Sequence, residues 1–170
     1  GTTLPADAAR DLMLANITLK YTPSNSICYA TDGQVVGVGA GQQNRVDCVR
    51  LAGEKARTWW LRQAPSTLEI LADTTKTRTA RTHAAFAHVK TIKNASSTTA
   101  AAPDKLAAPP MLCMASDGFL PFADNIDVCA SFGVQYVLQP GGSVRDSDVV
   151  DACASNGITM CMSGVRVFTH

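Results

Sequence analysis

The stretch MLCMASDGFLPFADNIDVCASFGVQYVLQPGGSVRDSDVVDACASNGITMCM, residues 111–162, decides the fold of this chain. Three short apolar runs in it alternate with two segments of helical spacing. The apolar runs cover residues 111–115, 134–138 and 158–162, and the helical segments cover residues 122–132 and 147–156. Strands that alternate with helices predict parallel pairing and a sheet that is covered on both faces.

The region before this stretch predicts a helix, a hairpin and a second helix. Apolar residues at helical spacing predict a helix over residues 5–20. Two strands are expected at residues 26–31 and 34–39, because Asp32-Gly33 between them favours the left-handed two-residue turn of a hairpin. A glycine turn over residues 39–43 then leads into a helix from about 44 to 63.

Residues 65–110 differ in composition from the rest. They are rich in Thr, Ala and Lys and contain two Ala-Pro stretches, which indicates a variable insertion. We expect this insertion to be helical around residues 79–90 and loop-like over 94–110. After it, Asp146 or Ser147 suits the N-cap of the last helix, and Gly157 suits its C-terminal end.

The complete order is therefore α-ββ-α, an insertion, and β-α-β-α-β. This is the layout of cytidine-deaminase-like folds, and we expect an α/β protein with a three-layer α-β-α arrangement. The zinc deaminases of that class need a His/Cys-x-Glu element and a Pro-Cys-x-x-Cys element. Neither element occurs in the sequence, so we expect no metal, and a deaminase interpretation would require bound zinc.

Composition excludes several classes of protein. Hydrophobic residues make up 46% of the 170 residues and charged residues 17%, which is typical of a globular domain and not of a disordered chain. The net charge of +1 gives no bulk attraction to nucleic acid or to an anionic membrane. No apolar run reaches the roughly 20 residues of a membrane-spanning helix. The six cysteines are spread singly, which predicts reduced, buried thiols in a cytosolic protein.

Five ordered blocks of this sequence resemble the AICAR transformylase/IMP cyclohydrolase family. They are LKYTPSNSICY (19–29), GVGAGQQNR (37–45), LAGEKA with WWLR (51–56 and 59–62), SDGFLPFADN (116–125) and VRVF (165–168). With the helices between them, the resemblance covers about 1–64 and 111–170, and leaves the insertion outside. It implies that residues 1–170 are the C-terminal half of the transformylase domain of this bifunctional purine-biosynthesis enzyme.

The family's reaction transfers a formyl group from the co-substrate 10-formyltetrahydrofolate to the 5-amino group of AICAR. The products are FAICAR and tetrahydrofolate, on the path to IMP. That amine is a poor nucleophile, so the reaction needs a base for its proton and a stabiliser for the oxyanion. In the family these are a His and a neighbouring Lys in the other half of the domain. The pair nearest to this pattern here, His88-Val-Lys90, lies in the insertion and in the wrong context.

The resemblance assigns four residues to AICAR, namely Asn25, Arg45, Phe119 and Arg166. A side-chain amide such as that of Asn25 both donates and accepts, which suits a carboxamide, although a loop Asn also satisfies its own turn. Arg45 at a helix start could meet an anion, and a solvated surface Arg is its alternative. Arg166 matches a phosphate-binding residue, and its alternative is again a surface charge.

The resemblance assigns four further residues to the folate, namely Val46, Asp124, Ser143 and Val144. Asp124 matches a carboxylate that could accept from the pterin amino and ring N–H groups, or it is simply a charge at a helix N-terminus. Val46 has a plain core residue as its alternative. The local pattern Pro-Gly-Gly-Ser departs from the family's Pro-Ser-Gly-Ser but keeps Ser143. The family commonly ends in His-His, so Thr169 leaves the role of His170 in doubt.

Two hypotheses follow for the chain as a whole. One is half of a transformylase domain, which binds nucleotide and folate while the Lys-His pair lies upstream in a longer protein. The start at Gly1 without an initiator Met agrees with such a longer protein, whose other domain would be the cyclohydrolase. The alternative is a non-catalytic nucleotide-binding module of the same fold. The resemblance also implies a cytoplasmic homodimer that shares its sites across the subunit interface.

Overall fold

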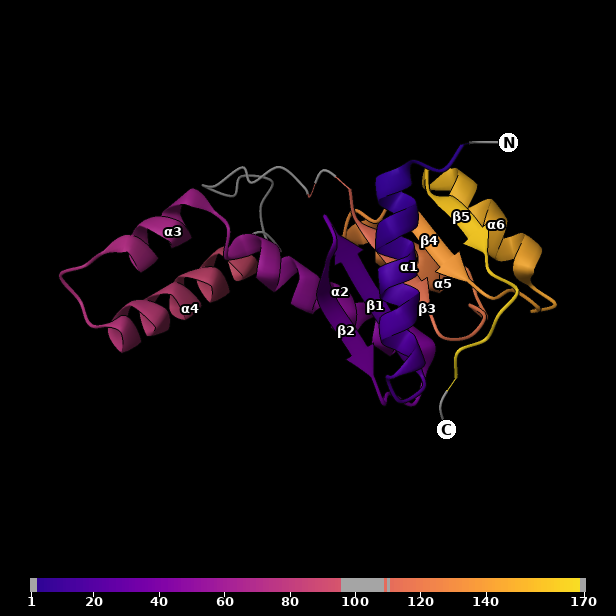
Figure 1. Cartoon of the computed structure of the whole chain (residues 1–170), viewed down its shortest axis with the longest axis horizontal. Coiled ribbons are helices and arrows are strands. Elements are labelled where there is room, and N and C mark those ends of the chain that lie inside the picture. Colours follow the sequence, from indigo (N-terminus) through magenta and orange to yellow (C-terminus); the bar gives the residue numbers. More distant parts are fainter. Residues whose placement is uncertain (1–2, 96–108, 110, 169–170) are drawn as a thin grey trace. The chain divides into compact units, whose positions relative to one another are not determined.

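The computed structural model describes residues 3–95, 109 and 111–168. The chain divides into two compact units, residues 1–56 with 109–170 and residues 57–108. Figure 1 labels the helices and strands of both. Most of the loop expected over 94–110, and the C-terminal His170, lie outside the described residues.

The first unit contains the predicted helices and strands, with ends that shift by about two residues at most. Its elements are α1 (Ala6–Lys20), β1 (Ser26–Thr31), β2 (Gln34–Ala40), the first part of α2 (Arg45–Leu61), β3 (Cys113–Ser116), α5 (Asp124–Ser131), β4 (Tyr136–Gln139), α6 (Asp146–Ser155) and β5 (Thr159–Met162). The alternation of short apolar runs with helical spacing was therefore sufficient to predict the element order.

The five strands form one mixed sheet in the order β2-β1-β3-β4-β5. Strand β1 is antiparallel to both β2 and β3, whereas β3, β4 and β5 are parallel to one another. Parallel neighbours joined by helices need crossover connections, and α5 and α6 provide them. The start of β1 consequently lies beside the end of β3, since Ile27 pairs with Ser116.

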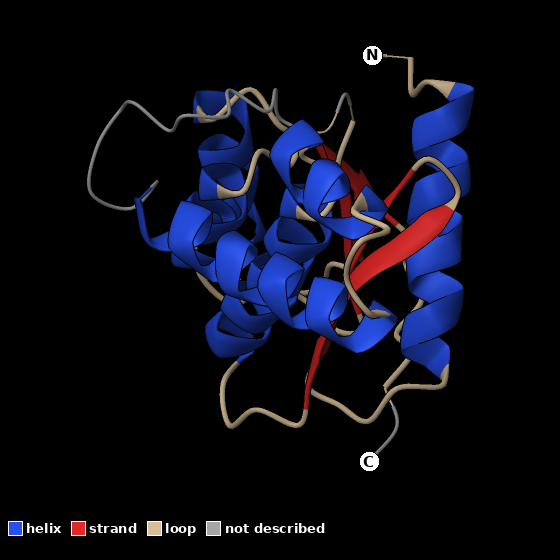
Figure 2. Cartoon of the chain, turned by 90° about the vertical axis from the view of Figure 1, so that its left-hand side faces the viewer, coloured by secondary structure: helices blue, strands red, loops and turns tan. Residues whose placement is uncertain are grey.

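Helices cover both faces of the sheet, so the expected three-layer α/β arrangement is confirmed (Figure 2). On one face α1 packs against alternate strand residues. The buried cluster there consists of Ala15, Leu19, Cys28, Ala30 and Ala115. On the opposite face the Tyr29 hydroxyl donates to the Val49 carbonyl of α2 at 3.3 Å, and its ring meets the ring of Phe132 edge-on at 6.3 Å.

The hairpin turn between β1 and β2 has the predicted left-handed backbone. Asp32 has φ +48° and Gly33 has φ +70°, the region that the Asp-Gly dipeptide tolerates best. The Gly33 N–H donates to the buried carboxylate of Asp11 on α1 at 2.8 Å, and Arg10 Nε donates to the same oxygen at 3.0 Å. The carboxylate thereby fixes the hairpin to α1.

The predicted N-cap of α6 is wrong, whereas its predicted end is right. Arg145 occupies the N-cap position, and its side chain makes no capping hydrogen bond. Asp146 is the first helical residue, and its carboxylate accepts from the Gly142 N–H at 2.7 Å. The positive φ of Gly142 lets the preceding loop fold back onto the helix start. Gly157, with φ +66°, follows the helix as expected.

The second unit is a helical hairpin that composition predicted only in part. It contains the end of α2, α3 (Pro65–Ala72) and α4 (Arg78–Ala95), and a buried cluster of Leu61, Val89 and Ile92. Helix α4 is longer than the expected 79–90, and α3 was not expected. Pro65 stands at the first position of α3, where its missing N–H costs no helical hydrogen bond.

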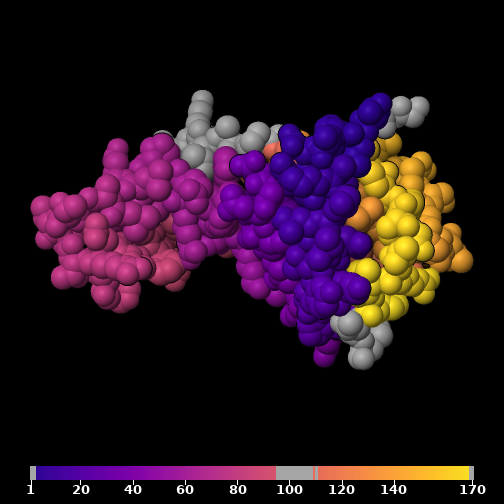
Figure 3. Space-filling model, in the orientation of Figure 1, coloured from indigo at the N-terminus to yellow at the C-terminus, as the bar shows by residue number. Residues whose placement is uncertain are grey.

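The outer side of α1 forms part of the molecular surface (Figure 3). Met13, Ile17 and Tyr21 follow one another at four-residue spacing and are 62%, 56% and 78% exposed. Residues at this spacing share one side of a helix, so they form an apolar stripe on the surface. Among the described helices, none has the length and apolarity to span a membrane.

Candidate functional site

The carboxyl ends of β3, β4 and β5 and the start of β1 meet at one edge of the sheet. In open α/β sheets ligands bind outside the carboxyl ends of the strands. Asn25 precedes β1, Phe119 follows β3, Ser143 follows β4 and Arg166 follows β5, so the fold brings these four predicted residues to the same edge.

A pocket of about 330 Å³ opens at this edge. Its lining residues are Asn25, Asn44, Arg45, Phe119, Pro121 and Phe168. Three of the four residues predicted to bind AICAR are therefore neighbours in one cavity, although 94 positions separate Asn25 from Phe119 in the sequence. The binding roles themselves stay predictions.

Arg166, the fourth of these residues, lies against the aromatic residues of the same pocket. Its guanidinium carbon stands 5.4 Å from the centre of the Phe119 ring and 5.9 Å from that of Phe168. Cations are attracted to the faces of aromatic rings at such distances. The side chain is exposed, and within the described residues it forms no ion pair, so its charge can meet an anionic group at the pocket.

Arg45 is held differently, because its charge is compensated within the protein. The side chain is only 8% exposed and its Nη1 donates to the carboxylate of Asp117, which is fully buried. Nη1 also donates to the Ser116 hydroxyl at 3.1 Å, and Nη2 donates to Asn25 Oδ1 at 2.9 Å. The alternative of a solvated surface arginine is thus wrong for Arg45.

The backbone of Asn25 is fixed by the turn that follows β2 and by α2. Its carbonyl accepts from the Gly41 N–H at 3.1 Å and from the Cys48 thiol at 3.1 Å. Burial raises the pKa of Cys48, so this thiol stays protonated and able to donate. The Asn25 side chain is therefore presented from a well-anchored position.

None of the four residues predicted to bind folate is among the lining residues of the pocket that contains Asn25, Arg45 and Phe119. Val46 is half-buried in the first turn of α2, and Asp124 begins α5, where it accepts from the Asn125 amide at 2.8 Å. Ser143 accepts from the Arg145 N–H at 3.1 Å, and Val144 is fully exposed. A folate role for these four is neither supported nor opposed by a cavity among the described residues.

One contact links the loop that precedes Asp124 to the loop that carries Ser143. The Arg145 guanidinium lies over the Phe122 ring at 5.1 Å, so the loop after β4 is joined to the loop after β3. The two loops flank the sheet edge at which the nucleotide residues gather. The two loops therefore lie close together, while the folate roles of Asp124 and Ser143 stay predictions.

Sequence reasoning missed four residues of the site. Asp117 lies inside the recognised SDGFLPFADN block but was given no role, and its partnership with Arg45 spans 72 positions. Asn44, Pro121 and Phe168 also lie in recognised blocks. The blocks themselves were the available signal, because no local pattern distinguishes these residues from ordinary loop residues.

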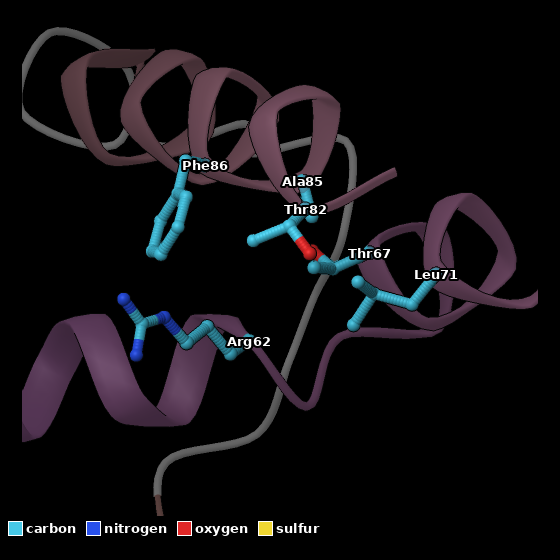
Figure 4. Close-up of a pocket in the computed structure, with 6 residues that line it drawn as sticks. All are labelled: Arg62, Thr67, Leu71, Thr82, Ala85 and Phe86. Carbon is cyan, nitrogen blue, oxygen red and sulfur yellow. The ribbon is translucent and has the colours of Figure 1, made fainter. Parts of the chain in front are cut away.

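The second unit has a cavity of its own, of about 180 Å³, and none of the predicted site residues lines it (Figure 4). Arg62 lies over the ring of Phe86 at 4.7 Å on one side of this cavity. His88 and Lys90 are both on α4, two positions apart, and residues at that spacing do not face each other on a helix. His88 Nε2 instead forms a hydrogen bond with the Ser66 hydroxyl at 2.7 Å.

No group of three or more His, Cys, Asp or Glu side chains with the geometry of a metal site occurs in the part of the chain that the structure describes. The six cysteines, all of which are described, form no disulfide. Five of them are buried and Cys161 is half-buried, so the expected burial of the thiols is confirmed for five.

Comparison with known proteins addresses the family directly. The family model of the AICARFT/IMPCHase bienzyme matches residues 2–55. The "Bifunctional purine biosynthesis protein PurH" of Xylella fastidiosa (strain 9a5c) is 35% identical over 167 residues, which cover 98% of this chain and 23% of the relative. The protein of the same name from Xanthomonas oryzae pv. oryzae (strain PXO99A) is 36% identical over 160 residues, which cover 94% of this chain and 22% of the relative.

The chain thus spans about a quarter of the length of the curated relatives it matches. The aligned region runs through residues 65–110 as well, although we expected the resemblance to leave that segment out. Identity of about a third over nearly the whole chain, together with the family match to residues 2–55, confirms the resemblance found in the five sequence blocks. The chain is accordingly similar in sequence, over nearly its whole length, to proteins named as bifunctional purine biosynthesis proteins.

Proposed function

We propose that this chain is the nucleotide- and folate-binding half of an AICAR transformylase domain. In this proposal the formyl group passes from 10-formyltetrahydrofolate to the 5-amino group of AICAR, and FAICAR and tetrahydrofolate are released. The observation that carries the proposal is the pocket in which Asn25, Arg45 and Phe119 meet, with Arg166 against the Phe119 ring.

The chemistry of the pocket supports binding rather than proton transfer. Within the part of the chain that the structure describes, its lining includes amides, aromatic rings and one compensated guanidinium, and no His or Lys. Asn25 can hold a carboxamide by hydrogen bonding, and the exposed charge of Arg166 suits a phosphate. Asp124 at the start of α5 and Ser143 in the loop after β4 are the groups we assign to the folate. The base and the oxyanion stabiliser would then come from a Lys-His pair elsewhere in the longer enzyme.

A turnover and binding experiment tests this proposal. We expect the 170-residue chain to bind AICAR in a calorimetric titration, and to release no tetrahydrofolate when 10-formyltetrahydrofolate is added. Activity should return when the chain is combined with the remaining part of a relative such as the Xylella protein. Turnover by the isolated chain, or a failure to bind AICAR, would contradict the proposal.

The same experiment separates the proposal from its alternative, a non-catalytic nucleotide-binding module. The alternative is favoured by the absence of an adjacent Lys-His pair from the sequence. It predicts that AICAR binds but that complementation never restores formyl transfer. We further propose that the chain works in the cytosol as part of a homodimer, for which the apolar stripe Met13, Ile17 and Tyr21 offers a contact surface. Light scattering on the purified chain measures its oligomeric state.

A further inference from the structure

Asp117 is a fully buried carboxylate whose contacts extend beyond its ion pair with Arg45. It follows β3 directly, and both of its carboxylate oxygens have partners. Oδ1 accepts from Arg45, and Oδ2 accepts from the Ser26 N–H at 3.1 Å. Its backbone N–H donates to the Ser26 carbonyl at 3.3 Å, and its carbonyl accepts from the Val167 N–H at 3.1 Å. Asp117 therefore joins the start of β1, the end of β3, the start of α2 and the C-terminal segment.

Arg45, the partner of Asp117, attracts a further anion only weakly, because its positive charge is already compensated. A buried guanidinium needs a compensating charge, and Asp117 supplies it for Arg45. A phosphate that bound Arg45 would have to compete with a carboxylate that is already in place. A second guanidinium nitrogen, Nη2, donates to Asn25 Oδ1 at 2.9 Å. Arg45 therefore holds the side chain of Asn25 in place.

This hydrogen bond fixes the polarity of the Asn25 amide. A guanidinium can only donate, so the atom that faces it must be the amide oxygen. The amide nitrogen, for which the structure gives no hydrogen bond within the described residues, is then the group that Asn25 offers to a ligand in the pocket. An amide N–H recognises a hydrogen-bond acceptor and discriminates against a donor.

We propose that Asp117 is a positioning residue that sets the specificity of the pocket. By compensating Arg45 it holds the guanidinium in place, and through the guanidinium it keeps the Asn25 amide turned to donate. The pocket consequently selects a ligand that presents a carbonyl oxygen to Asn25, as the carboxamide of a nucleotide does. The identity of this ligand rests on the proposed function, whereas the chain of contacts from Asp117 to Asn25 does not.

The test compares two nucleotides on the Asp117→Asn variant of the full chain. Calorimetry measures the affinity for AICAR and for 5-aminoimidazole ribonucleotide, which has no carboxamide. We expect the variant to weaken AICAR binding by at least about tenfold, the effect of losing one charge-assisted hydrogen bond, and to leave the second nucleotide within about twofold. Asp7→Asn is the matched control, because Asp7 forms an exposed ion pair with Arg10 and should change neither affinity.

A second variant keeps the test decisive if Asp117→Asn fails to fold. Asn25→Asp replaces the amide nitrogen by an oxygen and should cause the same selective loss of AICAR binding. An equal loss for both nucleotides would overturn the proposal, because it would mean that these residues support the pocket only generally. Unchanged AICAR binding in either folded variant would overturn it as well.

If the unmodified chain binds neither nucleotide, the proposed function fails, and the chain of contacts is tested without ligand. In nitrogen-15 NMR spectra Asp117→Asn should shift the side-chain amide signals of Asn25 and speed solvent exchange of the Arg45 guanidinium protons, while Asp7→Asn should do neither. Unchanged Asn25 and Arg45 signals would overturn the positioning role.

Discussion

Gly39 of β2 lies so close to Cys48 of α2 that a Cβ atom at Gly39 would stand 2.2 Å from the Cys48 carbonyl oxygen. Gly37, two residues earlier on the same strand face, has the same relationship to the Ala52 carbonyl, at 2.1 Å. The absence of side chains at these two positions lets α2 rest directly on the strand. This close approach sets the position of the start of α2, and hence of Arg45, at the pocket.

Gly39→Ala should therefore destabilise the protein by about 3 kcal/mol, because the helix backbone must move to admit the methyl group. The matched control is Gly157→Ala, where the added Cβ meets nothing within 4 Å and only the positive φ of +66° opposes the change. We expect a loss of roughly 1 kcal/mol there. Chemical denaturation measures both, and equal losses would show that the contact with α2 contributes nothing of its own.

These glycines illustrate what could be predicted from sequence and what could not. The Asp32-Gly33 turn and the end of α6 at Gly157 depend on local backbone preferences, so the dipeptide and the single glycine were enough to predict them. Gly39 looked like part of a turn, because a close approach between a strand and a helix depends on tertiary packing that no local pattern encodes. Helix α3 was hidden in the same way by the Thr- and Ala-rich composition around it.

The candidate site likewise contains some features that the sequence predicts and others that depend on tertiary packing. Family resemblance named Asn25, Arg45 and Phe119, and the fold brings all three to one pocket. The pairing of Arg45 with Asp117 could not be predicted, since a buried ion pair between distant segments leaves no signal in either segment. The residues predicted to bind folate come from α2, from α5 and from the loop after β4, and their arrangement gives no independent support for their assignment.

Asp11 provides a second stability prediction, because it fixes the hairpin to α1. Its buried carboxylate accepts from the Gly33 N–H at 2.8 Å. Asp11→Asn removes the negative charge of the acceptor, and we expect the free energy of unfolding to fall by about 2 kcal/mol. Asp7→Asn is the control, since Asp7 is 73% exposed in its contact with Arg10 and should cost less than about 0.5 kcal/mol. Similar losses in thermal or denaturant unfolding would contradict the assigned role of Asp11.

The buried thiols make a prediction about chemical reactivity. Burial raises the pKa of Cys28 and of Cys113 to about 12, and that of Cys153 to about 11. The thiolate is the reactive form, so at pH 8 these thiols should be alkylated by iodoacetamide far more slowly in the native chain than in denaturant. Half-buried Cys161 should react first. Mass spectrometry of time points locates the label, and early labelling of Cys28 would contradict the structure.

The same thiols predict how stability changes at alkaline pH. Their pKa values rise from 9.0 in the reference state to about 12 for Cys28 and Cys113 in the folded chain, so the folded state holds these protons more tightly. Their contribution to stability is complete below pH 9 and is lost as the pH rises from 9 to about 12. The free energy of unfolding should fall over that range, and less steeply in Cys28→Ala than in the unmodified chain. A parallel pH profile for the variant would refute this origin of the effect.

The last prediction distinguishes the role of Arg166 from that of Arg45. The charge of Arg45 is compensated by Asp117, whereas Arg166 lies exposed over Phe119. Binding of the phosphate of a nucleotide should therefore depend on Arg166. In Arg166→Gln the affinity for AICAR should fall by about tenfold or more, whereas the affinity for the corresponding riboside, which has no phosphate, should stay unchanged. Arg50→Gln, which removes an arginine already paired with Asp47, is the control and should alter neither affinity. Calorimetric titration of both ligands measures the difference, and an equal loss for nucleotide and riboside would mean that Arg166 supports the Phe119 ring instead of binding the phosphate.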